Sequence, residues 1–519
     1  MKLASWLLVI AVLAAATAAG AQETVGRYAG VSSIDGEPPF KTFLEIHRSG
    51  TAISGHLEIP GQTFVVEDAR ADGNHIRGKL VGDGTSADFN LLVTPETARG
   101  EFTLEGQHGT FDLERTELTA EQVLGSAPER QDLTAAEWND DLQELVRIVT
   151  KEHVAPYHHV PEERFRRETE RVRRLIPDLS GREEAVEFRR LTAMIGDGHT
   201  GTRLFSNQPR YPISMAWLED GLRIVETTAV NRSLLGATVL GVDGVPAKEA
   251  LEAMRPFTPA DENEGVFRDF APILLARPEV LRRAGIGSGG SLRWTVDDLS
   301  GERRTVALEP QAVEDADWVR PNPDAPLWRQ RPDEQFWSVY WDDFETLYVN
   351  FRGYEDLPRN ADRFFGELDR LRPARLIIDL RDNGGGDYEK GRRLVIEPLA
   401  QRAWINSRGR LFVMIGRQTF SAAMVNAVDF GARTEAILVG EPIGEKPNSY
   451  QEVRQFTLPN SGLAVGVSTK WYEFMPGDPA NEIRPDIVAP PRWEDWLSPR
   501  DNAVERVLQG QRDDGEPGR

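Results

Sequence analysis

The sequence of 519 residues contains no cysteine and only 8 histidines. The lack of cysteine excludes disulfide bonds, thiolate zinc sites, iron–sulfur clusters, a cysteine nucleophile and a cysteine-linked lipid anchor. The histidines include a small group, His153 with His158 and His159, but no carboxylate stands at a recognisable metal-ligand spacing from it. We therefore expect neither a metal ion nor another cofactor.

Positive charge and long apolar runs are also scarce. Lys and Arg total 61 against 83 Asp and Glu, so the formal net charge is −22, which argues against nucleic acid as a partner. The apolar run at residues 7–16 (LLVIAVLAAA) is shorter than the roughly 20 residues of a membrane span. Lys2 before it and Ala19-Gly20-Ala21 after it predict a signal peptide at residues 1–21. We expect an exported, periplasmic or extracellular protein without a stable membrane anchor.

Patterns of apolar and turn residues divide the remaining chain into regions. Residues 22–118 alternate short β-type runs with glycine-containing turns, which predicts an antiparallel meander of seven or eight strands, a small barrel or sandwich. Residues 132–205 have helical periodicity, and residues 211–310 return to strands with some helical stretches. The Pro- and Asp-rich residues 319–337 predict a linker, and residues 510–519 a disordered tail.

Residues 338–509 alternate strand-type and helix-type segments. The order β-α-β-α-β-α-β predicts a mostly parallel sheet flanked by helices, because crossovers between parallel strands are right-handed. In such sheets reactive loops follow the carboxyl ends of the strands. Two of these loops carry unusual residues.

The first loop has three consecutive glycines at 384–386, and the second has Ser421 at the first turn of a helix. Glycines let successive N–H groups converge on an oxyanion, and a helix N-terminus favours negative charge beside a serine nucleophile. The N–H of Ala422 would then form part of an oxyanion hole. A plain strand-to-helix turn and a plain N-cap serine are the structural alternatives.

A serine nucleophile requires a base, and the sequence offers two candidates. Every histidine precedes residue 200, which excludes the Ser…Asp/Glu…His order of α/β-hydrolases for Ser421. His199 stands in a glycine-flanked loop (IGDGHTG), and Lys446 follows the serine by 25 residues.

The segments DGHT, IIDLRDNGGG, GRQTFSAAMVNAVDFG and LVGEPIGEKPNSY, with Pro485-Asp486-Ile487, together resemble the carboxyl-terminal processing (tail-specific) serine peptidases and their tricorn-core relatives. The resemblance implies an α/β crotonase/ClpP-like peptidase core, a helical subdomain and a degenerate PDZ-like segment near residues 216–254. It implies hydrolysis of proteins or peptides through an acyl-enzyme on Ser421, with the N–H groups of Gly385 and Ala422 as oxyanion hole.

The resemblance leaves the base open between its two branches. In the Ser–Lys branch Lys446 is the base, although adjacent Glu445 would disfavour the neutral amine. In the tricorn-like branch, which we favour, His199 is the base and Glu482 is the nearest match to the acidic residue that orients it. The alternative function is a catalytically inactive peptide-binding protein. The physiological substrate, the oligomeric state and the role of the β module stay open.

Overall fold

The structure is a computed structural model that describes residues 23–34, 40–59, 62–82, 85–104, 106–116, 129–206, 208–312, 316–322, 324, 326–478 and 481–509. The predicted signal peptide and tail lie outside these residues. The chain forms two compact units, Met1–Pro128 and Glu129–Arg519. Within the described ranges no helix is both long and apolar enough to cross a membrane.

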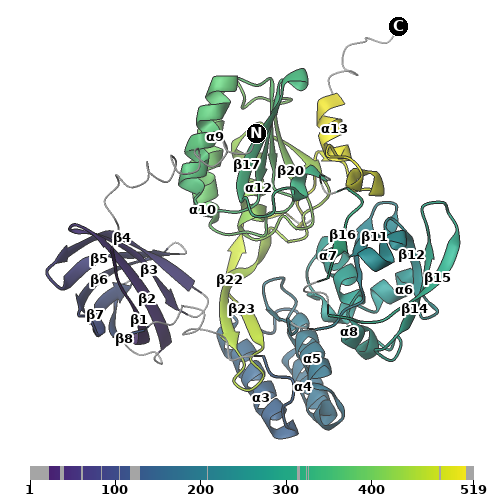
Figure 1. The fold of residues 1–519 in the computed structure, drawn as a ribbon, viewed down its shortest axis with the longest axis horizontal. Coiled ribbons are helices and arrows are strands. Elements are labelled where there is room, and N and C mark those ends of the chain that lie inside the picture. The colour runs from purple at the N-terminus through teal and green to yellow at the C-terminus, as the bar shows by residue number, and fades with distance from the viewer. Residues whose placement is uncertain are drawn as a thin grey trace, which may run out of the picture. The chain divides into compact units, whose positions relative to one another are not determined.

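The first unit is a closed barrel of eight antiparallel strands, each paired with the next and the last with the first (purple in Figure 1). The predicted meander is thus confirmed, and it closes. Alternate side chains of each strand fill the interior, where the rings of Phe102 and Phe111 lie 4.5 Å apart. The strands are β1 (Glu23–Ile34), β2 (Phe40–Ser49), β3 (Ala52–Ile59), β4 (Gln62–Asp72), β5 (His75–Gly82), β6 (Thr85–Val93), β7 (Thr97–Leu104) and β8 (Gln107–Arg115).

The second unit begins with a helical region of α3 (Ala135–Glu152), α4 (Glu162–Leu175) and α5 (Gly181–Ala193). A capping box starts α3, because the hydroxyl of Thr134 and the carboxylate of Glu137 each bond the other residue's N–H. The apolar faces of the helices meet around buried Trp138, Leu142 and Phe188.

The β-rich region that follows is a seven-stranded sheet around buried Trp294. The segment expected as a linker contributes β16, which pairs with β11, and a short 3-10 helix with buried Leu327. The elements are β10 (Ile213–Leu218), β11 (Gly221–Thr228), β12 (Thr238–Val242), β13 (Val245–Pro246), α6 (Ala247–Glu252), α7 (Glu264–Leu275), α8 (Pro278–Arg283), β14 (Leu292–Asp297), β15 (Arg303–Leu308) and β16 (Trp318–Val319).

The core is a six-stranded sheet in the order β17-β18-β19-β20-β21-β24. All neighbours in it are parallel except β17, which pairs antiparallel with β18, so the predicted alternation is observed. The strands are β17 (Phe336–Trp341), β18 (Thr346–Phe351), β19 (Arg375–Asp379), β20 (Leu411–Ile415), β21 (Ile437–Gly440) and β24 (Ile487–Val488).

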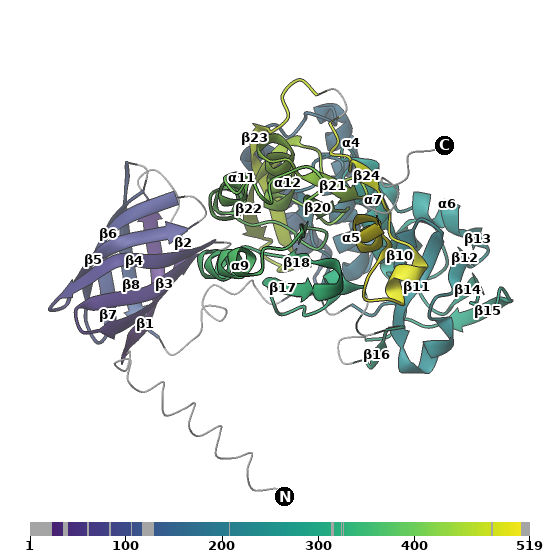
Figure 2. The ribbon, with the colours of Figure 1, turned by 90° about the horizontal axis from the view of Figure 1, so that it is seen from above.

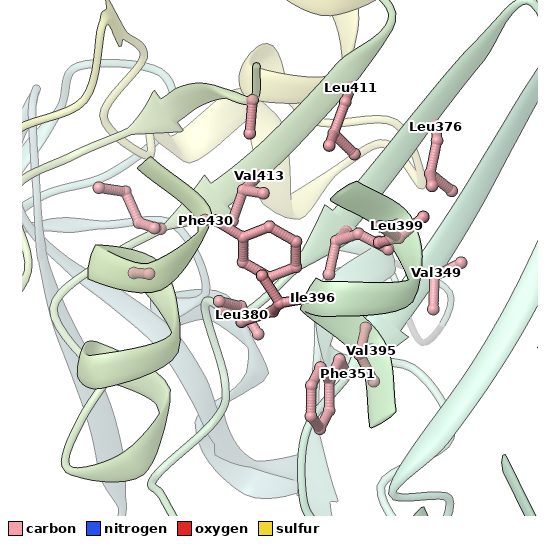
Figure 3. Close-up of a cluster of buried hydrophobic side chains, with 14 of the residues drawn as sticks. Val349, Phe351, Leu376, Leu380, Val395, Ile396, Leu399, Leu411, Val413 and Phe430 are labelled. Atoms are coloured by element: carbon pink, nitrogen blue, oxygen red, sulfur yellow. The ribbon is translucent and has the colours of Figure 1, made fainter. Parts of the chain in front are cut away.

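Helices cover both faces of this sheet, because alternate side chains of its buried strands point to opposite sides. On one side Phe430, Ile396 and Leu399 pack on Leu376 and Val413 (Figure 3). The helices there are α9 (Leu357–Leu371), α10 (Tyr388–Gly391), a π-helical turn (Arg392–Ile396), α11 (Glu397–Ala400) and α12 (Ala422–Arg433). On the other side α13 (Asn502–Gln509) covers Ile377 and Met414. Figure 2 shows α12 next to β20.

A long hairpin, β22 (Asn448–Thr457) and β23 (Ala464–Glu473), joins the core to the helical region. It runs from the core sheet towards α3 in Figure 1, and its far end packs among the helices. There β23 pairs with β9 (Gly201–Thr202), the strand that directly follows His199. This pairing carries the histidine loop from the helical region to the core.

Candidate active site

Ser421 is the residue immediately before α12, at the end of the loop that follows β20. Its φ of 53° and ψ of −123° lie where residues with a Cβ are rarely found, and such strain is concentrated at functional sites. Thr419 fixes the loop, because its hydroxyl donates to the carbonyl of Leu380 (2.8 Å) and accepts from the N–H of Gly416 (3.0 Å). Among the described contacts the Ser421 side chain makes no N-cap hydrogen bond.

The glycine-rich loop after β19 lies directly against Ser421. Fully buried Asn383 ties it in place: its carbonyl accepts from the N–H of Phe420 at 3.0 Å, and its amide donates to the carbonyl of Phe351 at 2.9 Å. Gly385 has a φ of 114°, and a Cβ there would lie 2.6 Å from the Cβ of Ser421. Both the φ and the close approach therefore require glycine at position 385.

The two N–H groups expected to form an oxyanion hole are both beside Ser421 in this arrangement. Ala422 is the first residue of α12, where a helix leaves its N–H without an intrahelical partner. The N–H of Gly385 donates to Oδ1 of Asn383 at 3.0 Å, so it already has a partner in this conformation. An acyl oxygen would have to replace that partner.

His199 reaches the serine loop from the helical region. Its ring lies against that of Phe420, the residue before Ser421, with 4.7 Å between the ring centres. Asp197 shapes the loop, because its Oδ1 accepts from the N–H groups of His199 (3.1 Å) and Thr200 (2.8 Å). The same oxygen accepts the hydroxyl of Ser468 on β23 at 2.6 Å.

His153 supports this loop from behind. Its Nδ1 accepts from the N–H of Ala155 at 2.9 Å, so the ring proton is on Nε2, which donates to Oδ2 of Asp197 at 3.0 Å. His153 and Asp197 are both buried. In the parts of the chain that the structure describes, no three His, Asp or Glu side chains are placed to hold a metal ion.

A third side chain, the fully buried carboxylate of Glu445, contacts both Ser421 and His199. Its Oε2 accepts from the N–H of Ser421, and its Oε1 lies 3.6 Å from Nδ1 of His199. Oε1 also accepts from the hydroxyl of Ser449 (3.3 Å) and the amide of Gln451 (3.1 Å) on β22. One carboxylate thus joins the serine loop, the histidine loop and the hairpin.

The electrostatics of the site are governed by burial. Burial lowers the pKa of His199 to about 4, and the Asp197 carboxylate opposes this shift only partly. Among the described residues neither ring nitrogen of His199 makes a hydrogen bond of good geometry, although the backbone of Tyr450 lies beside the ring and favours its protonated form. Burial, with repulsion from Glu262 as a smaller cause, raises the pKa of Glu445 well above its ordinary value. The site therefore holds a neutral imidazole over a wide pH range.

The other two predicted residues have different surroundings. The ammonium of Lys446 lies 3.0 Å from Oδ1 of Asp261, and none of the described contacts joins it to Ser421. Glu482 lies in a segment next to the Glu445 loop, because the carbonyl of Ile483 accepts from the N–H of Ile443 at 3.1 Å. Its carboxylate pairs with Arg484, and none of the described contacts joins it to His199 or Ser421.

Two residues of this arrangement had no assigned role in the sequence analysis. Glu445 was considered only for its effect on Lys446, although it follows β21 just as Ser421 follows β20. His153 was considered only as a metal ligand. Position at the carboxyl end of a parallel strand is a signal that could have identified Glu445; nothing in the sequence around His153 indicates its bond to Asp197.

Comparison with solved structures reveals distant relatives in fold. A mutant of CPAF matches with a TM-score of 0.50 and 12% identity, over 74% of this chain and 99% of that chain. The photosystem II D1 C-terminal processing protease has a TM-score of 0.33 and 14% identity over 69% and 93% of the two chains. The tricorn protease has a TM-score of 0.34 and 14% identity over 93% and 46%. No family model and no curated protein matches the sequence. The chain therefore shares its fold with CPAF.

Proposed function

We propose that the chain is a serine peptidase that cleaves peptide bonds of proteins or peptides through an acyl-enzyme on Ser421. The carboxylate of Glu445 carries the proposal, because it accepts from the N–H of Ser421 and lies 3.6 Å from Nδ1 of His199. It links a serine with a strained backbone to a buried imidazole. The assignment of peptides as the substrate class rests on the sequence motifs.

In the proposed reaction Nε2 of His199 accepts the hydroxyl proton of Ser421 while Oγ attacks the scissile carbonyl carbon. The imidazolium that forms lowers the pKa of neighbouring Glu445, since opposite charges favour each other. His199 then protonates the leaving amine as the C–N bond breaks. Water, deprotonated by His199, hydrolyses the acyl ester and restores the serine.

The developing oxyanion would be held by the N–H groups of Ala422 and Gly385. Ala422 supplies an N–H at the positive end of α12. Gly385 would exchange its hydrogen bond with Asn383 for one with the substrate. Ala422 needs little rearrangement for this role, whereas Gly385 must first release Asn383.

The finer assignments belong to the same proposal. The ion pair of Lys446 with Asp261 supports His199 as base, and with it the tricorn-like branch of the tail-specific peptidases. The segment 216–254 is proposed as a degenerate PDZ-like element, and residues 1–21 as an export signal. The orienting acid is proposed to be Glu445, in preference to Glu482.

A fluorophosphonate probe tests the proposal, because it phosphonylates an activated serine without knowledge of the substrate. We expect labelling at Ser421 in the full chain and none in Ser421→Ala. Mass spectrometry of a peptide library treated with the two proteins should then show cleavage by the wild type alone. Folded wild-type protein that is neither labelled nor active would instead support the inactive peptide-binding protein.

A further inference from the structure

Three consecutive residues, 261–263, connect the loops of the candidate site from outside it. They precede α7 in the β-rich region. The N–H of Asp261 donates to the carbonyl of Gly196 at 3.0 Å, and the amide of Asn263 donates to the carbonyl of Ile443 at 2.8 Å. Gly196 belongs to the histidine loop and Ile443 to the loop of Glu445. We call residues 261–263 the clamp segment.

Glu262, in the middle of the clamp segment, binds both loops with one carboxylate. Its Oε1 accepts from the N–H of Gly198 at 2.9 Å, and its Oε2 accepts from the N–H of Lys446 at 3.2 Å. Gly198 directly precedes His199, and Lys446 directly follows Glu445. Backbone N–H groups of the residues next to the candidate base and its orienting acid are therefore held by the two oxygens of the same side chain.

We propose that Glu262 is a positioning residue that sets the distance between His199 and Glu445, and that it does so only as an ionised carboxylate. The inference rests on the proposed function of Ser421 and His199. An ionised carboxylate accepts strongly on both oxygens, whereas protonation converts one oxygen into a hydroxyl and glutamine replaces one oxygen by an NH₂ group. The NH₂ group cannot accept from a backbone N–H, and the hydroxyl oxygen accepts more weakly than a carboxylate oxygen, so one of the two loops is held less tightly.

The charges that face Glu262 set the pH at which this weakening occurs. The two backbone N–H groups and the ammonium of Lys446 favour the carboxylate, while burial and the neighbouring Asp197 and Glu445 favour the protonated form. Burial is the largest cause and raises the pKa of Glu262 to about 7. Because the pKa of His199 is held at about 4, the base itself stays neutral through this range.

The experiment measures the rate of fluorophosphonate labelling of Ser421 in the full chain between pH 5 and 9. We compare wild type with Glu262→Gln, which matches the shape of glutamate, and with Glu264→Gln as control. Glu264 lies two residues further on, and its exposed side chain pairs with Arg255. Thermal unfolding and circular dichroism verify that all three proteins are folded.

We expect the wild-type rate to rise through about pH 7 and the Glu262→Gln rate to stay low and flat. The two rates should be similar at pH 5.5 and differ on the order of 10-fold at pH 8.5, the effect expected of losing one hydrogen bond to a charged group. Glu264→Gln should follow the wild type. If the ratio of the wild-type rate to the Glu262→Gln rate were the same at all pH values, Glu262 would be only a structural residue. The proposal would be overturned if Glu262→Gln were labelled as fast as wild type, or if its labelling rate still rose through pH 7.

A second measurement does not depend on activity. Hydrogen exchange, followed by mass spectrometry, reports the protection of the N–H groups of Gly198 and Lys446. After correction for intrinsic exchange, wild-type protection should fall below pH 7, and Glu262→Gln should lack it at one or both sites. Normal protection in the variant would refute the positioning role. If folded wild type were not labelled but hydrogen exchange at Gly198 and Lys446 still depended on Glu262, the peptidase proposal would be refuted. The role of Glu262 in holding the two loops would then still stand.

Discussion

The strained backbone of Ser421 predicts an unusual order of stability among its variants. Ser421→Ala and Ser421→Gly both remove the hydroxyl, but only alanine keeps a Cβ at φ 53° and ψ −123°. Strain of this kind costs about 1–3 kcal/mol. Glycine relieves this strain, but its greater conformational freedom stabilises the unfolded chain by about 0.4–1 kcal/mol. The net expectation is that Ser421→Gly is more stable than Ser421→Ala by about 1 kcal/mol.

Urea unfolding of the two variants, followed by tryptophan fluorescence, measures this difference. Ser338 provides the matched control because it lies in β17 with ordinary extended backbone. Ser338→Gly should be less stable than Ser338→Ala by about 0.5–1 kcal/mol, which is the reverse of the order expected at Ser421. The comparison uses one chain throughout, so the barrel unit contributes equally to each measurement.

The outcome also separates a nucleophile from a helix cap. A simple N-cap serine has ordinary extended backbone, and its replacement by alanine costs about 0.5–2 kcal/mol. Equal stability of the two Ser421 variants, or a more stable alanine, would show that no strain is stored at this position. That result would remove the structural reason for regarding Ser421 as more than a cap, even if the loop geometry were otherwise correct.

Four further predictions concern the site and the barrel. Gly385→Ala should abolish probe labelling in folded protein, because its Cβ would lie 2.6 Å from that of Ser421; normal labelling would show that the two loops separate easily. His199→Ala should slow acylation on the order of 100-fold or more, with Lys446→Ala costing less; inactivity of Lys446→Ala alone would favour the Ser–Lys branch. Because the pKa of His199 falls to about 4 on folding, the unfolded chain binds that proton first, and this histidine should lower the measured free energy of unfolding as pH drops from about 6.5 to 4. Deletion of residues 22–118 should preserve labelling at Ser421, and a folded but unlabelled truncation would show that the barrel completes the site.

Local patterns made the barrel, the helical region and the order of core elements predictable. Period-2 alternation defines strands such as β8, and the crossover rule then implies the parallel sheet. The structure of residues 319–337 was harder to predict, because their Pro- and Asp-rich composition is typical of linkers. Its packing depends on a partner far away in sequence: Trp318 and Val319 pair with β11.

The hairpin of β22 and β23 explains why the sequence could identify individual residues of the site but could not predict how they come together. Ser421 and His199 are separated by more than 200 residues, and the pairing of β23 with β9 connects the histidine loop to the hairpin of the core. The hydroxyl of Ser468 adds a bond from β23 to Asp197. Pairing of strands so distant in sequence leaves no local signal, since each strand alone is an ordinary amphipathic segment.

The position of Glu445 has a physical explanation that applies beyond this residue. The loops that follow β19, β20 and β21 carry Gly385, Ser421 and Glu445 in turn, and neighbouring parallel strands bring those loops to one edge of the sheet. Motif spacing directed attention to Lys446 and Glu482, whereas sheet order selects Glu445. A buried carboxylate there is costly unless it is hydrogen-bonded, and Glu445 receives three donors from two different segments. Those donors give the side chain a structural reason to lie between Ser421 and His199, since without them its buried oxygens would lack hydrogen-bond partners.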